Sequence, residues 1–119
     1  METVNYLFSM KIKVKPLSVN DAWKGRRFKT EDYEVYEKEL FYLLPNGLQI
    51  GSELYVEFGF SSSASDIDNP LKPLLDILQK KYGFNDKLIE KLTIVKKTVP
   101  KGEEYIDLEF TSPLDLSTA

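Results

Sequence analysis

Two stretches of alternating apolar and polar residues constrain the fold of this chain most. In residues 6 to 14 polar residues such as Ser9 and Lys11 separate an apolar set made of Tyr6, Phe8, Met10, Ile12 and Val14. The same spacing recurs in Leu54, Val56, Phe58 and Phe60. Because successive side chains of a strand point to opposite faces of a sheet, the pattern predicts two strands, each with one face buried.

Two other stretches have the spacing of helices. Residues 30 to 43 open on Thr30 and two acids, end before Pro45, and place on one face Tyr33, Tyr36, Leu40 and Leu43. We read this face as a core stripe. The second helix carries Leu71, Leu74, Leu75 and Leu78 at i, i+3, i+4 and i+7, so its apolar face should lie against the sheet. It should begin at about residue 69 to 71, with Asn69 as the N-cap and Pro70 as the first helical residue.

The rest of the chain completes one domain. The segments LTIVKKTV and EYIDLEF flank Pro100-Lys101-Gly102, which predicts a hairpin of two further strands. Residues 16 to 29 read as a long loop, and residues 112 to 119 as a frayed tail. The order strand, helix, strand, helix, strand, strand predicts an α/β (α+β) fold: a mixed, mostly antiparallel four-stranded sheet covered by two helices. With 119 residues and 42% apolar content, residues 1 to 119 should form a single domain.

The chain contains no cysteine and no histidine. Disulfides, thiolate metal sites, histidine bases and Ser-His or Cys-His arrangements are therefore excluded, and any catalysis must use carboxylates, lysine, tyrosine or a hard metal ion. The N-terminus lacks the apolar core of a signal peptide, and no stretch approaches the ~20 apolar residues of a membrane span. We expect a cytoplasmic protein without a membrane partner.

Charge is distributed unevenly along the chain. The formal net charge is -3, which argues weakly against a nucleic-acid partner. Five acids and no basic residue lie from Glu103 onward, however, so residues 1 to 102 hold 16 basic and 14 acidic groups. The segment WKGRRFK gathers Lys24, Arg26, Arg27 and Lys29. This segment predicts a local anion site, and the alternative is an ordinary solvated loop.

The segment DIDNPLKPLLD, residues 66 to 76, concentrates acidic residues around one lysine. Asp68, Lys72 and Asp76 are spaced i, i+4 and i+8, a polar stripe beside the leucines. Asp66 and Asp68 point to the same side of an extended segment, so their carboxylates can converge. Carboxylates held together repel unless a cation neutralises them, and without His or Cys that cation is Mg²⁺ or Mn²⁺.

Simpler interpretations of these acids also stand. Asp68 can cap the helix and pair with Lys72 while Asp66 is solvated. Asp86, which follows a turn at Gly83, can return a third carboxylate to the start of the helix, or belong to an ordinary Asn-Asp turn. A calcium-binding EF-hand loop is excluded because Pro70 and Leu71 occupy its fifth position and its glycine position.

Three segments together resemble the RusA family of Holliday-junction resolvases of bacteria and their prophages: PLSVNDAWKGRRFKTEDYEVY, DIDNPLKPLLDIL and FNDKLIEKLTIVKK. That family shows an Asp-x-Asp-Asn-x-x-Lys segment, an Asp-x-Leu continuation of the helix, and an acidic pair followed by a hydrophobic position. The resemblance covers roughly residues 10 to 100. It implies that Asp66, Asp68 and Asp86 hold a divalent metal and that Lys72 assists them. Asn85 replaces the first member of the family's acidic pair, which puts a role for that carboxylate in doubt.

The resemblance also implies supporting roles. Asn69 and Asp76 should support the site, with Asp76 as the partner of Lys72. The basic loop, Lys24, Arg26, Arg27 and Lys29, should contact DNA phosphates. Trp23 should anchor this loop by packing, and the alternative is stacking on an unpaired base.

These roles amount to a Mg²⁺-dependent endodeoxyribonuclease that resolves four-way junctions in recombination and repair. Mn²⁺ should substitute for Mg²⁺, and a homodimer would present two sites. Two hypotheses of other classes remain: a non-catalytic branched-DNA-binding or replication-accessory module with the same fold, and a small protein-interaction domain with an acidic face.

Overall fold

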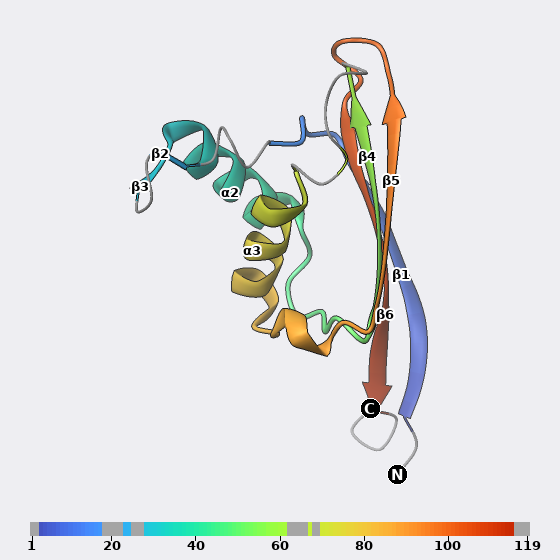
Figure 1. The fold of residues 1–119 in the computed structure, drawn as a ribbon. Helices are drawn as coiled ribbons and strands as arrows, with labels where there is room; N and C mark the ends of the chain where they lie inside the picture. Colours follow the sequence, from blue (N-terminus) through green and yellow to red (C-terminus); the bar gives the residue numbers. More distant parts are fainter. Residues whose placement is uncertain (1–2, 18–22, 25–27, 62–66, 68–69, 116–119) are drawn as a thin grey trace.

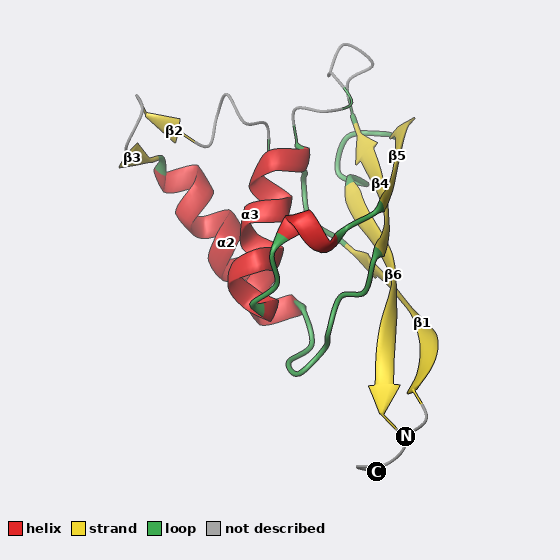
Figure 2. Ribbon diagram, turned by 60° about the horizontal axis from the view of Figure 1, so that its bottom comes forward, coloured by secondary structure: helices red, strands yellow, loops and turns green. Residues whose placement is uncertain are grey.

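The computed structural model describes residues 3–17, 23–24, 28–61, 67 and 70–115. Its main sheet contains β1 (Thr3–Ile12), β4 (Glu53–Phe60), β5 (Lys91–Thr98) and β6 (Tyr105–Asp115), in the order β1-β6-β4-β5. Strand β6 is antiparallel to both β1 and β4, and β4 is parallel to β5. Helices α2 (Glu31–Leu43) and α3 (Leu71–Tyr82) lie on one face of the sheet (Figures 1 and 2). The predicted α+β fold is confirmed.

The direction of the strands determines which loops are neighbours. Because β1 and β4 are both antiparallel to β6, strands β1, β4 and β5 all run the same way. Their last residues, Ile12, Phe60 and Thr98, therefore lie at one end of the sheet, which we call the carboxyl end of the sheet. The chain leaves β4 at this end on its way to α3 (Figure 1).

The core lies between the sheet and the two helices. The sheet contributes Val56 and Phe58 from β4 and Ile106 and Leu108 from β6. The helices contribute side chains that are fully or almost fully buried, among them Tyr33, Tyr36, Leu40, Leu74, Ile77 and Leu78. The interpretation of the α2 tyrosines as a core stripe is confirmed. Leu74 and Leu78 are buried as predicted, whereas Leu71 and Leu75 are half-buried at the margin of the stripe.

The two helices begin differently. Thr30 caps α2 as predicted, since its Oγ1 accepts a hydrogen bond of 3.1 Å from the Tyr33 N–H. The prediction that Asn69 caps α3 is wrong, because Pro70 occupies the N-cap position and its carbonyl accepts from the Leu74 N–H at 3.4 Å. Pro73 is accommodated in the first turn, where a backbone N–H has no partner to lose.

The prediction of a hairpin between the last two strands is wrong. A turn does join β5 to β6, with the Glu103 N–H donating to the Pro100 carbonyl at 3.0 Å and Gly102 at φ 94°. Strand β4 nevertheless lies between β5 and β6 in the sheet. Residues 56 to 60 of β4 are all buried, and a strand buried on both faces belongs in the middle of a sheet.

Two predicted irregular segments contain strands. Within the predicted long loop, β2 (Trp23–Lys24) and β3 (Phe28–Lys29) form a small antiparallel ribbon. Within the predicted tail, β6 continues to Asp115, which lies opposite Thr3 of β1. The tail prediction is therefore wrong for residues 112 to 115, because β1 is long enough to pair with them, while residues 116 to 119 lie outside the described residues. No helix in the described part is long and apolar enough to span a bilayer.

Candidate functional site

The acidic segment of residues 66 to 72 connects the end of β4 to the start of α3. Asp66, Asp68 and Asn69 lie outside the described residues, whereas Lys72 is placed in the first turn of α3. The chain therefore leaves β4 for this segment at the carboxyl end of the sheet, where β5 also ends. In sheets with parallel strands this is the end at which ligands usually bind.

Lys72 forms an ion pair with Asp76 one helical turn further along. The Lys72 Nζ lies 2.9 Å from the Asp76 Oδ1, which confirms the predicted pairing of Lys72 with Asp76. The Lys72 side chain is 66% exposed and that of Asp76 is 23% exposed. Exposed pairs of this kind contribute only about 0.3–0.5 kcal/mol. The amine of Lys72 can therefore leave Asp76 at little cost when an anion binds nearby.

Asp86 lies beyond the other end of α3. Gly83 ends the helix in the left-handed conformation at φ 67°, and Asp86 then opens the short helix η1 (Asp86–Leu88), orange in Figure 1. A helix of 12 residues is about 18 Å long, so Lys72 and Asp86 flank its two ends. For Asp86 to meet Asp66 and Asp68, the chain between β4 and α3 must reach back along the helix. Because the side chain of Asp86 is also outside the description, the convergence of the three aspartates stays a prediction.

The donor chemistry can be compared with the metal that was predicted. All three predicted ligands are aspartates, and hard carboxylate oxygens are the ligands that Mg²⁺ and Mn²⁺ prefer. Among the described residues, no three or more carboxylates are grouped so that they could hold a metal ion. The two ligands nearest in sequence, Asp66 and Asp68, fall outside that part of the chain.

The predicted DNA-binding loop is described only at its two strands. In the ribbon Trp23 lies opposite Lys29, and Lys24 lies opposite Phe28. The side chains of these four residues lie outside the described part of the chain. Arg26 and Arg27 lie outside it entirely. The ribbon leads directly into Thr30 and α2, so the basic segment is joined to the helix layer of the domain (Figure 2).

A buried carboxylate on the open face of the sheet was not predicted. Glu57 of β4 points away from the helices, yet it is only 8% exposed. Its carboxylate accepts hydrogen bonds from the Tyr105 hydroxyl at 2.5 Å and the Tyr55 hydroxyl at 3.0 Å, and Lys97 lies 3.5 Å away. The hydrogen bond from Tyr105 is the main reason that the pKa of Glu57 is lowered, and it raises the pKa of Tyr105 to about 12.

The sequence contains one indirect signal for this cluster. Gly59 lies opposite Tyr105 in the register of β4 and β6, which places Glu57 diagonally across from the tyrosine. A Cβ at position 59 would collide with the Tyr105 ring, so the glycine allows the ring to lie flat across β4. A glycine within a strand often marks such a close approach.

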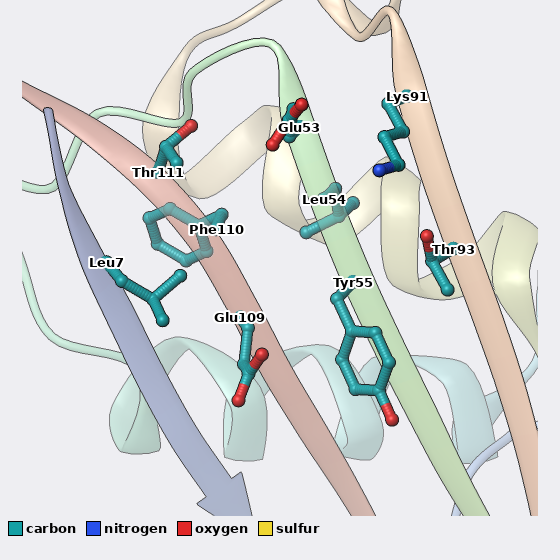
Figure 3. Close-up of a pocket in the computed structure, with 9 residues that line it drawn as sticks. All are labelled: Leu7, Glu53, Leu54, Tyr55, Lys91, Thr93, Glu109, Phe110 and Thr111. Carbon is teal, nitrogen blue, oxygen red and sulfur yellow. The ribbon is translucent and has the colours of Figure 1, made fainter.

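A pocket of 180 Å³ also lies on the open face, toward the start of β4. Figure 3 shows Leu7, Tyr55, Thr93 and Glu109 around it, with the helices behind the sheet. Glu53 and Lys91 mark its position at the start of β4 and of β5. Lys72, in the first turn of α3, does not line this pocket.

Comparisons with known proteins assign no family to this chain, so any functional assignment must rest on its own residues. No protein-family model matches this chain, and no curated protein matches it either.

Proposed function

We propose that this protein is a Mg²⁺-dependent DNA endonuclease that cuts four-way junctions. The observation that supports this most is the position of Lys72. It lies in the first turn of α3, three residues after Asn69, and the chain reaches this helix after leaving β4 at the carboxyl end of the sheet. A lysine close in sequence to two aspartates is suited to phosphodiester hydrolysis, in which a carboxylate-bound metal would activate water and a positive charge would stabilise the developing negative charge.

Each residue has a defined role in this proposal. Asp66, Asp68 and Asp86 hold the metal, which when bound activates water and neutralises charge on the phosphate oxygens. Lys72 exchanges its weak contact with Asp76 for the scissile phosphate, where negative charge develops. Asn69 and Asp76 support these groups. In the basic segment Trp23 acts as an anchor, and the phosphate contacts are made by Lys24, Arg26, Arg27 and Lys29.

A four-way junction requires two symmetric cuts. A homodimer with isologous two-fold symmetry presents two sites in the matching arrangement. The expected products carry 5′-phosphate and 3′-hydroxyl ends. We place the protein in the cytoplasm, in recombination and repair of a bacterium or of a phage.

A cleavage assay on a synthetic four-way junction tests the proposal. Asp68→Asn and Asp86→Asn should each abolish cleavage in Mg²⁺, because each removes a metal ligand, and both variants should still bind the junction. Asp76→Asn removes the same charge and should reduce cleavage far less, since Asp76 supports Lys72 without binding the metal. Undiminished cutting by either ligand variant would overturn the site.

One observation favours a second candidate, a branched-DNA-binding module without catalysis. Asn85 occupies the place of the first member of the family's acidic pair. A protein of that kind would bind the junction tightly and leave it uncut in both Mg²⁺ and Mn²⁺, so the same assay distinguishes the two.

A further inference from the structure

Three lysines lie along the last residues of β1 and the residues directly after it. Lys11, Lys13 and Lys15 are all exposed, while the residues that alternate with them, Ile12, Val14 and Pro16, are buried. The buried residues fix the backbone against the core, so the three amines are held on the outside of one segment. We call these three residues the lysine row.

The lysine row separates two hollows in the surface. One of 640 Å³ is lined by Lys11 and Lys13 together with Val99, Glu103 and Tyr105. The other, of 530 Å³, is lined by Lys13 and Lys15 and extends to α2, where its lining includes Asp32, Val35, Tyr36 and Glu39. Because Lys13 borders both hollows, the row forms a continuous track from the sheet to α2. Figure 1 shows this segment, in blue, crossing from the carboxyl end of the sheet toward the helix layer.

One end of the row is held in place by the buried carboxylate described above. The Lys11 Nζ lies 4.0 Å from the centre of the Tyr105 ring, a cation–π contact. That ring is fixed by its hydrogen bond to Glu57 and by its packing over Gly59. Lys11 is therefore oriented before any ligand binds, which lowers the entropy lost on binding.

The charges around the row leave its amines available. The ion pairs of the described residues involve Lys72, Lys80 and Lys97, and none includes a member of the lysine row. Glu104, which lies near Lys15, accepts a hydrogen bond of 2.8 Å from the Gly102 N–H. The remaining nearby acids are Asp107, opposite Lys11 in the sheet, and the hollow-lining Asp32, Glu39 and Glu103.

We infer that the lysine row is a second contact surface for the DNA backbone, separate from the basic loop at residues 24 to 29. The inference rests on the proposed function for its ligand, a DNA arm. A row of exposed amines along a concave track is complementary to a row of phosphates, and such contacts bind through charge without reading sequence. The row lies at the carboxyl end of the sheet, where the chain also leaves β4 toward α3.

The salt dependence of binding tests this surface directly. The probe is a fluorescent four-way junction, titrated without Mg²⁺ at several salt concentrations with wild type and with Lys13→Gln/Lys15→Gln. Each lost phosphate contact should reduce the slope of log K against log salt by about 0.9, so the double variant should lose nearly 2. Lys38→Gln/Lys91→Gln removes the same charge from exposed positions away from the row and should leave the slope unchanged. Equal slopes for the two double variants would overturn the inference.

A charge change of opposite sign provides a second test. Glu103 lines the hollow that contains Lys11 and Lys13, so Glu103→Gln should tighten junction binding severalfold by removing repulsion. Weaker binding by this variant would contradict an anion in that hollow.

The outcomes also separate this inference from the nuclease proposal. If the wild type cuts the junction and the two double variants have equal slopes, only the lysine row fails. If binding depends on the lysine row but nothing is cut in Mg²⁺ or Mn²⁺, the nuclease proposal fails and the lysine row stands. Absence of junction binding at low salt overturns both.

Discussion

The charged state of Glu57 depends on residues that are far away in the sequence but close in the fold. Its carboxylate is almost fully enclosed on a face of the sheet that no helix covers. Two tyrosine hydroxyls and Lys97 replace the water that it loses. Because a buried charge without partners is costly, the partners of Glu57 should matter for stability far more than exposed ion pairs do.

Tyr105→Phe should lower the free energy of unfolding by about 1–3 kcal/mol at pH 7, because it leaves a buried carboxylate short of a donor. Tyr55→Phe is the matched control and should cost less, since its hydrogen bond to Glu57 is longer and only partly buried. Urea denaturation at pH 7 measures both. Equal costs for the two variants would contradict the leading role of Tyr105.

The same pair predicts a pH dependence of definite sign. The pKa of Glu57 is lowered in the folded state, so its contribution to stability is complete above its unfolded pKa, about 4.5, and is lost as the pH falls through the folded pKa. The difference in stability between wild type and Tyr105→Phe should therefore shrink as the pH falls from 5 to 3. A difference that stays constant over this range would show that the hydrogen bond does not favour the ionised form.

At this scale, local spacing revealed Lys72 and Asp76 but not Glu57. The Lys72–Asp76 pair follows from four residues of helix, whose geometry is the same in every protein. The partner of Glu57 is 48 residues away and depends on the register of β4 and β6. Alternation alone marks Glu57 as an outward residue and carries no information about what covers it.

Among the helices and strands, the contact between α2 and α3 is specific. The last turn of α2 contains no basic residue, and Lys81 of α3 provides one. The Lys81 Nζ donates to the Phe41 carbonyl at 2.8 Å and to the Asn46 Oδ1 at 2.6 Å, while the Tyr82 hydroxyl donates to the Pro45 carbonyl at 2.8 Å. Carbonyls at the end of a helix lack partners within it, so α3 serves as the cap of α2.

Lys81→Met should destabilise the protein by about 1–3 kcal/mol, because it removes a charged donor from two acceptors and keeps most of the apolar side chain. Lys38→Met, at an exposed position of α2, is the control and should change stability by less than about 0.5 kcal/mol. Thermal or urea unfolding of both variants gives the comparison. A loss at Lys81 no larger than at Lys38 would mean that the cap contributes nothing.

The sequence predicted which segments form strands and helices better than it predicted their partners. Every predicted strand and helix is present, because side-chain periodicity is a local property. The β5–β6 hairpin was wrong because Pro100 and Gly102 determine a turn and not which strand fills the space beside it. Similarly, residues 112 to 115 become part of β6 only because β1, at the other end of the chain, extends far enough to pair with them.

For the molecule as a whole, a predicted metal site implies a measurable link between metal and stability. If Asp66, Asp68 and Asp86 bind Mg²⁺ only when folded, Mg²⁺ at ten times its Kd should add about 1.4 kcal/mol to the free energy of unfolding. Thermal melts with and without Mg²⁺, at matched ionic strength, measure this. Asp68→Asn should lose the response and Asp76→Asn should keep it; an equal response in both would place the metal elsewhere.

The position of β6 has a consequence for how the chain reaches its native state. Strand β1 joins the rest of the sheet through β6 alone, with pairs as distant in sequence as Thr3 and Asp115. Closing so long a loop is entropically costly, and topologies dominated by such pairings fold slowly. A chain interrupted after residue 104 would leave β1 separated from the β4–β5 pair, with backbone edges exposed to self-association. We therefore expect β6 to pair with β1 and β4 late in folding, in one cooperative step that stabilises both halves of the sheet together.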